Sequence, residues 1–216
     1  MCTKEERDKR IREMLSRKSE KTVEKMNSVA EKIEIKTAIA PQIIQNSYGI
    51  SDPDLCPQIA KGEAYIKNLA QDVEAAIKNY TGCGYIGING GLRRGRTSRG
   101  FSPDEFAYMV SRIDIAFRNA PPLDVAMNVY RGVRKIEDLR DDSGFSSCSL
   151  AERVSSGFGA GNVFTITIPA GSRVLFVKPI SIVPMEDEVL IDRGGMFREL
   201  LPEKLIYVSQ LTYDEE

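Results

Sequence analysis

The sequence contains no histidine among its 216 residues. Histidine is the usual base of a nucleophile–base triad and the commonest protein ligand of metal ions, so its absence removes both of these groups from any site. The four cysteines, Cys2, Cys56, Cys83 and Cys148, are scattered and lack the paired spacing of a zinc site. We therefore expect no metal, and we expect any general base or cation-stabilising group to be a carboxylate.

Long hydrophobic runs are also missing. No apolar run is long enough to span a bilayer, and the first ten residues, MCTKEERDKR, lack the apolar core of a signal peptide. Scattered cysteines suit a reducing compartment. We expect a cytoplasmic protein, acting in the cell that makes it or in an infected cell, and a secreted toxin component is the less favoured alternative.

The length suits one globular domain with an appendage, and 42% apolar and 28% charged residues are ordinary for a soluble protein. We expect a charged, helical N-terminal segment over residues 1–60 and the main domain over 61–216. Acidic and basic residues alternate through a broken helical stripe in the first segment. This pattern favours a solvated helix or helix pair, and a basic arm that binds nucleic acid is the alternative.

Helical patterns come first in the main domain and strand patterns come later, which predicts an α+β fold. One helix is expected over residues 63–80, capped near Gly82, and a second begins at Ser102-Pro103 with a hydroxyl cap, a proline and two acids. A short helix is expected over 151–158. The predicted strands are 125–130, an edge strand around 144–150, 163–168, 173–178, 189–191 and 205–213.

Residues 82–87, GCGYIG, match the GxGxxG pattern of dinucleotide-binding loops. That fingerprint requires a strand before it and a helix after it, whereas here a helix precedes and an arginine-rich loop follows. We interpret the motif as a helix-ending turn. Of the arginines at 93, 94, 96 and 99, one or two are suited to grip a phosphate, and the others are solvated or contact a macromolecular partner.

Two glutamates, Glu186 and Glu188, stand at the entrance of the short apolar strand 189–191. Residues i and i+2 of a strand lie on one face, so both carboxylates are expected to point the same way. Taken alone, such residues are more often solvent-facing than catalytic.

Three motifs follow one another in the chain: Tyr130-Arg131-Gly132, then the Phe-x-Ser-x-Ser segment 145–149, then Glu186-x-Glu188. In this order they resemble the Arg, Ser-Thr-Ser, Glu-x-Glu class of mono-ADP-ribosyltransferases. The class includes clostridial exoenzymes, binary-toxin catalytic domains and phage Mod-type enzymes.

Two further segments fit the resemblance, which covers residues 63–213. Tyr80-Thr81, Ile88-Asn89 and Leu92-Arg93 look like the family's NAD-contacting helix and loop, and Pro179-Ile180-Ser181 looks like the start of its acceptor-recognition loop. Cys148 departs from the pattern by replacing the central Thr. Its side chain is expected to point away from the neighbouring serines, which leaves the site intact.

The resemblance implies a core of two packed β-sheets with flanking helices, and an enzyme that transfers ADP-ribose from NAD to an acceptor with release of nicotinamide. Glu188 would stabilise the positive charge that develops on the ribose and hold its 2′-hydroxyl. Ser147 would hold Glu188 by a hydrogen bond, and Arg131 would bind the pyrophosphate. The NAD-binding set is completed by Arg93, Asn89, Ser149 and Phe158, the last on the nicotinamide side.

Glu186 is assigned to the acceptor. In the family, Glu at this position accompanies arginine acceptors, because a carboxylate orients a guanidinium and accepts its proton. Target recognition is assigned to the loop residues Ser181, Ile182, Val183, Pro184 and Met185. The predicted partners are NAD and a host protein arginine, with RNA as an alternative acceptor and no membrane. An NAD glycohydrolase and a non-catalytic module that keeps the fold are the competing functions.

Overall fold

Helices fill the first half of the described chain and strands fill the second, which confirms the predicted α+β class. The computed structural model describes residues 55–95, 100–134, 139, 143–158, 162–201 and 203–208. All of these belong to one unit of the chain, residues 46–216. Most of the predicted segment 1–60, together with Arg96 and Arg99, lies outside the described residues, and the boundary at residue 60 stays a prediction.

The helices are α2 (Leu55–Lys67), α3 (Gln71–Asn79), α4 (Tyr85–Arg94), α5 (Pro103–Asn119) and the short α7 (Glu152–Ser155). A π-helical turn (Tyr80–Gly84) joins α3 to α4, and a 3₁₀ turn (Pro184–Glu186) precedes β5. The strands are β1 (Met127–Gly132), β2 (Ser146–Ser149), β3 (Val163–Ile168), β4 (Val174–Phe176), β5 (Glu188–Ile191), β6 (Met196–Leu201) and β7 (Lys204–Val208). None of the described helices is long and apolar enough to cross a membrane.

Helix α5 begins where the sequence predicted. The backbone N–H of Glu105 donates to Ser102 Oγ, and the N–H of Ser102 donates to the Glu105 carboxylate, which completes a capping box with Pro103 in the first turn. The helix then buries Val110, Ile113, Ala116 and Phe117 at helical spacing.

The prediction of a single helix over residues 63–80 was wrong. The chain breaks after Lys67, restarts at Gln71, and continues past Tyr80 through the π-helical turn into α4. Gly82 does not end the helix but forms a kink inside this turn, with φ −93° and ψ −120°. The GCGYIG motif therefore lies on helical backbone with no strand before it, so it is not a dinucleotide fingerprint.

The seven strands within the described residues form one hydrogen-bonded sheet in the order β4-β5-β2-β1-β3-β7-β6. Neighbouring strands are antiparallel except β3 and β7, which are parallel. The prediction missed β6 and placed β1 about two residues too early; the end of the predicted strand 205–213 lies outside the described residues. Between β1 and β2 only one residue pair, Tyr130 with Ser149, is in register, so the sheet is narrowly joined there.

The narrow joint divides the sheet into two halves that share one hydrophobic core. Val189 and Ile191 of β5 belong to the same buried cluster as Val129 of β1 and Ile166 of β3. The two halves thus pack across a common interior, as the predicted pair of sheets would, while hydrogen bonds keep them in one ladder.

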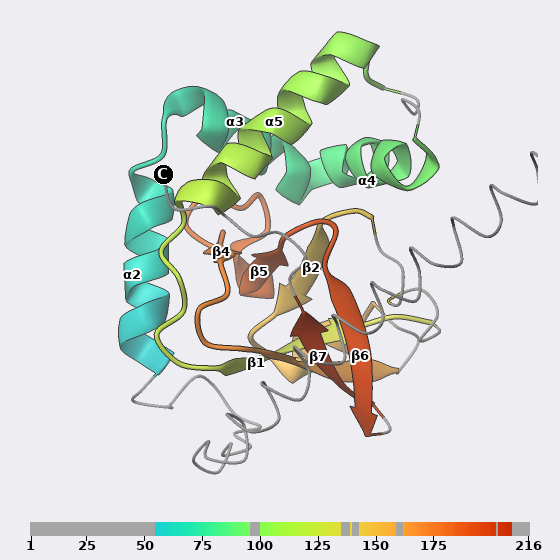
Figure 1. Ribbon diagram of the computed structural model, residues 1–216. Coiled ribbons are helices and arrows are strands. Elements are labelled where there is room, and N and C mark those ends of the chain that lie inside the picture. The colour runs from blue at the N-terminus through green and yellow to red at the C-terminus, as the bar shows by residue number, and fades with distance from the viewer. Residues whose placement is uncertain are drawn as a thin grey trace, which may run out of the picture. The chain divides into compact units, whose positions relative to one another are not determined.

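The other face of β4 and β5 is covered by α3, α4 and α5, which lie together above the sheet in Figure 1, whereas α2 runs along its left side. Leu175 and Leu190 from these strands pack in a second buried cluster with Ile77 of α3, Ile88 of α4 and Phe117 of α5. Because both of its faces are covered, all four residues of β5 are buried. Glu188 is the first residue of this strand, so the fold buries its carboxylate at the edge of the hydrophobic core.

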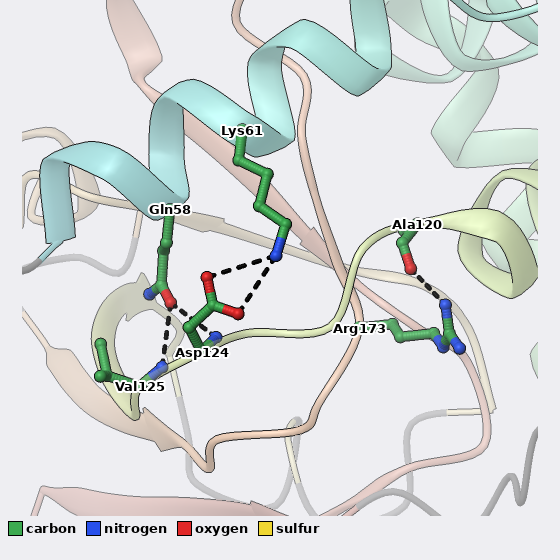
Figure 2. Close-up of polar contacts among 6 residues, drawn as sticks. All are labelled: Gln58, Lys61, Ala120, Asp124, Val125 and Arg173. Carbon is green, nitrogen blue, oxygen red and sulfur yellow. Dashed lines mark hydrogen bonds and ion pairs between the residues drawn. The ribbon is translucent and has the colours of Figure 1, made fainter.

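Helix α2 is tied to the segment that leads into β1 (Figure 2). Gln58 Oε1 accepts hydrogen bonds from the backbone N–H groups of Asp124 and Val125, at 3.1 and 3.2 Å, and Lys61 forms an ion pair with Asp124. Arg173, just before β4, donates to the Ala120 carbonyl in the same view. These contacts fix the start of β1 against α2 and β4.

Replacing Gly62 with alanine is expected to destabilise the protein by about 1–3 kcal/mol, because the added methyl group would overlap the buried ring of Phe176. In an exposed helix the same change would stabilise. The matched control is Gly157→Ala, where the nearest atom would lie at an ordinary 3.5 Å. Urea unfolding measures both, and equal stabilities would show that α2 does not pack as described.

Candidate active site

The carboxylate of Glu188 is the centre of the candidate site. Glu188 is the first residue of β5 and is only 6% exposed. Ser147 Oγ, on the neighbouring strand β2, donates a hydrogen bond of 2.6 Å to Glu188 Oε1, which confirms the contact predicted from the sequence. The carboxylate is therefore held in one orientation by a strand on which it does not itself lie.

Burial raises the pKa of Glu188 to about 7, from an ordinary value of 4.5. The hydrogen bond from Ser147 opposes this rise because it stabilises the charged form, and the negative charge of Glu186 adds to it. Near neutral pH the group is therefore poised between its two protonation states, a property typical of functional carboxylates.

Arg131 contacts Ser147 from a further strand of the sheet, β1. Its Nη1 donates to the backbone oxygen of Ser147 at 3.0 Å. The Arg, Ser and Glu of the predicted motif thus lie on adjacent strands β1, β2 and β5, although 57 residues separate Arg131 from Glu188 in the chain (188 minus 131). The structure brings these three predicted residues together at the narrow joint of the sheet.

Glu186 lies outside the strand that Glu188 begins, and the shared direction expected for the two carboxylates stays a prediction. Strand β5 begins only at Glu188, and Glu186 ends the 3₁₀ turn before it. Between them Asp187 adopts the left-handed conformation, with φ 45° and ψ 49°. Glu186 is half-buried, and its charge still reaches Glu188, since it contributes to the raised pKa of that group.

The second serine of the motif fixes the backbone rather than a carboxylate. Ser149 is buried, and its Oγ donates to the backbone oxygen of Glu186 at 2.7 Å. Cys148 points to the opposite side and is buried in the core shared by the two halves of the sheet, as expected for the departure from Ser-Thr-Ser. Ser149 thereby links the end of β2 to the loop before β5.

Asn89 is buried, and its amide bonds to groups of the protein. Its Nδ2 donates to the Tyr80 hydroxyl and to the Phe145 carbonyl, and its Oδ1 accepts from the Phe145 N–H at 3.0 Å. Asn89 therefore anchors the residue that immediately precedes β2. Its contact with the nucleotide stays a prediction.

The other predicted NAD contacts lie at the surface. Arg93 is exposed in the last turn of α4, just before Gly95. Phe158 follows α7 and is 64% exposed, which leaves its ring available for stacking. Their roles toward NAD also stay predictions.

The predicted acceptor loop presents apolar side chains to solvent. Ser181 is buried, whereas Ile182, Val183 and Met185 are exposed, Met185 to 83%. The N–H of Ile182 donates to Thr81 Oγ1 at 3.3 Å, which holds the loop against the π-helical turn. Among the described residues, no group of His, Cys, Asp or Glu side chains could hold a metal ion.

Two residues at this site escaped prediction from the sequence. Lys178, just after β4, forms an ion pair with Asp187 at 2.5 Å, and Asp187 turns the chain between the two glutamates. Asp is enriched in the left-handed conformation, so an Asp at position 187, directly before the strand, was the sequence signal from which this turn could have been predicted.

A protein-family model described as ADP-ribosyltransferase exoenzyme matches residues 60–139 and 134–199, which is more than half of the 216 residues. The comparison with curated proteins finds no match.

Solved structures of bacterial toxins share the fold. Plx2a, an ADP-ribosyltransferase toxin from Paenibacillus larvae, is 20% identical, with a TM-score of 0.54 over 68% of this chain and 90% of that one. BECa, an ADP-ribosylating toxin of a binary enterotoxin of C. perfringens solved with NADH, is 18% identical, with a TM-score of 0.59 over 76% of this chain and 49% of BECa. The Clostridium limosum C3 exoenzyme is 18% identical, with a TM-score of 0.56 over 79% of this chain and 96% of that one. These likenesses confirm the predicted ADP-ribosyltransferase-like fold.

Replacing Glu188 with glutamine is expected to stabilise the protein by about 1–3 kcal/mol at pH 8 and to change little at pH 4. The folded state keeps a proton on Glu188 up to about pH 7, whereas an unfolded chain releases it near 4.5, so stability falls as pH rises through this window. Glutamine removes that cost because it stays neutral.

Thermal unfolding at the two pH values measures this effect. Asp192→Asn is the matched comparison, because burial raises the pKa of Asp192 to about 7 as well. Both variants should gain stability at pH 8. A Glu188→Gln variant that gains nothing there would contradict the buried, desolvated carboxylate.

Proposed function

This chain belongs to the ADP-ribosyltransferase exoenzyme family, and from that premise we propose that it transfers ADP-ribose from NAD to an arginine of a target protein. The chain is a mono-ADP-ribosyltransferase and NAD is its substrate, so the proposal concerns the acceptor and the residues that act. One observation carries it: a buried Glu188 held by Ser147, with a second carboxylate, Glu186, in the loop just before it.

The first step is cleavage of the bond between nicotinamide and ribose. The ribose acquires positive charge as this bond breaks, and the ionised carboxylate of Glu188 stabilises that charge. Such stabilisation is effective because the carboxylate is already oriented before the reaction, by the 2.6 Å hydrogen bond from Ser147. A positive charge beside Glu188 also favours its ionised form and so lowers its pKa from the value in the free protein.

We propose that Arg131 binds the pyrophosphate of NAD. A guanidinium has five N–H donors, and Nη1 of Arg131 donates to the Ser147 backbone oxygen, which fixes the position of the group. Charge-assisted hydrogen bonds to phosphate are strong, so this residue holds the substrate next to Glu188. Arg93, Asn89, Ser149 and Phe158 complete the proposed NAD-binding set.

Glu186 acts on the acceptor. The arginine of the target protein attacks the ribose carbon that nicotinamide leaves, and the Glu186 carboxylate orients the guanidinium and accepts its proton. Its half-buried place in the loop leaves it accessible to a macromolecule, and Ile182, Val183 and Met185 are exposed beside it for target recognition. Pro184 shapes this loop as the first residue of the 3₁₀ turn, and Ser181 Oγ accepts from the Val183 N–H.

We propose that the reaction takes place in a cytoplasm. The four cysteines are scattered along the sequence and lack paired spacing, which suits a reducing compartment.

Substitutions of the two glutamates are expected to affect nicotinamide release and transfer to the acceptor differently. Glu188→Gln should lower nicotinamide release at least about 100-fold, because a neutral amide cannot stabilise the developing charge. Glu186→Gln should keep nicotinamide release within about threefold of wild type while transfer to protein arginine is lost. Both are measured with labelled NAD, with water and with a cell lysate as the acceptor source.

Mass spectrometry then identifies the modified residue or nucleotide in the lysate. Equal loss of both activities in Glu186→Gln would refute the separate roles. Release of nicotinamide with no labelled acceptor would instead support an NAD glycohydrolase.

Replacing Ser147 with alanine is expected to move the pH profile of NAD cleavage upward. The serine hydroxyl lowers the pKa of Glu188, so its removal raises that pKa beyond the value of about 7 in the wild type. Activity requires the ionised form, so kcat/KM should rise with pH through the midpoint in wild type and through a higher midpoint in the variant. Ser155→Ala is the matched control, because its Oγ donates to the Tyr130 carbonyl instead. An unchanged midpoint in Ser147→Ala would contradict the assignment.

A further inference from the structure

We propose that Asp187, the residue between the two glutamates, is a positioning residue whose left-handed backbone directs the Glu186 carboxylate toward the acceptor. The inference rests on the proposed function, because it concerns the residue that the proposal assigns to the acceptor. It adds a determinant of acceptor transfer beside the residues already assigned to NAD and to the target.

The backbone conformation of Asp187 is uncommon for a residue other than glycine. Among the described residues only Asp187, at φ 45°, and Glu203, at φ 62°, are non-glycine residues with positive φ. Asp tolerates this region better than most residues, but it still costs free energy unless the surroundings hold it. A residue kept in this conformation directly between two functional carboxylates therefore points to a local role.

The surroundings hold this backbone from two sides. The carbonyl oxygens of Glu186 and Asp187 accept from the end of β2, from Ser149 Oγ at 2.7 Å and from the Leu150 N–H at 3.1 Å. The next carbonyl, that of Glu188, accepts from the Val177 N–H at 3.2 Å, at the end of β4. Three consecutive carbonyl groups are thus bonded to the two strands that flank β5.

The side chain of Asp187 adds a contact of smaller weight. Lys178 Nζ lies 2.5 Å from Asp187 Oδ1, and the Lys178 side chain is about half exposed. Exposed ion pairs contribute at most about 1 kcal/mol, so the backbone conformation is the larger influence on the position of Glu186.

The consequence concerns where the two carboxylates go. An extended residue at 187 would continue β5 back to Glu186 and place both side chains on one strand face. With the left-handed residue at 187, β5 instead begins only at Glu188, and Glu186 stays in the preceding turn. One carboxylate becomes buried and bonded to Ser147 and the other half-buried in the loop, so the two acquire the different environments that two roles require.

Three substitutions separate backbone from side chain. Asp187→Gly and Asp187→Asn both accommodate the left-handed region, whereas Asp187→Val does not, because its side chain is β-branched. Transfer to arginine per NAD consumed should fall at least about tenfold in Asp187→Val and stay within about threefold in the other two. Retained transfer in Asp187→Val, or an equal loss in Asp187→Gly, would overturn the proposal.

Glu203→Val is the matched control for backbone strain. Glu203 lies between β6 and β7 and belongs to none of the residues assigned to NAD or the acceptor, so this variant should lose comparable thermal stability and keep the wild-type ratio of transfer to NAD consumption. If Glu203→Val also lost transfer, general destabilisation would explain the effect and the proposal would fail.

A second measurement keeps the test valid if arginine is not the acceptor. Glu188 is faced by Ser147 of β2 and by Glu186, with Arg131 bonded to the Ser147 carbonyl and Lys178 paired with Asp187. Displacing Glu186 removes a charge that raises the pKa of Glu188, so the pH midpoint of NAD hydrolysis should fall in Asp187→Val, as it should in Glu186→Gln.

Water is the acceptor in this assay, so it does not depend on the target. If wild type hydrolyses NAD but modifies no arginine, the proposed acceptor is wrong while the midpoint still tests Asp187. An unchanged midpoint in Asp187→Val, or an equal shift in Asp187→Gly, would refute the positioning role.

Discussion

Burying an ionisable carboxylate is the constraint on which the rest of this structure depends. Glu188 is 6% exposed, and desolvation is the largest cause of its raised pKa. An unpaired buried carboxylate is costly, and here one short hydrogen bond from Ser147 offsets part of that cost. A buried carboxylate that costs stability and is supported by a hydrogen bond is what the proposed role of Glu188 requires.

The fold creates that environment by covering β5 on both faces. Leu190 faces the helices α3, α4 and α5, and Val189 faces the core shared by the two halves of the sheet. The helices therefore do more than shield the sheet. They exclude water from one side of the strand that carries the carboxylate, and so raise the pKa of Glu188 through burial.

Local patterns in the sequence predicted the parts of the molecule that local interactions decide. The capping residues at Ser102 predicted the start of α5, and the ordered Arg, Ser and Glu motifs predicted the neighbours on three strands. The prediction of one helix over 63–80 was wrong because the hydrophobic spacing continues across the break between Lys67 and Gln71. The spacing of apolar residues alone therefore does not reveal that break. The left-handed turn at Asp187 was missed because its hydrogen bonds come from β2 and β4, which are distant in sequence.

The helical layer also reaches the site through one residue. Phe145 precedes β2 directly, both of its backbone polar groups bond to Asn89, and its ring stacks on Phe117 of α5. Since Ser147 lies two residues further on, the position of its hydroxyl depends on α4 and α5 as well as on the sheet. The orientation of Glu188 is therefore set by β2, whose entry the helices hold, while the orientation of Glu186 is set by the turn at Asp187. The two carboxylates thus have different local supports, Ser147 for Glu188 and the turn at Asp187 for Glu186, and they remain coupled because the charge of Glu186 raises the pKa of Glu188.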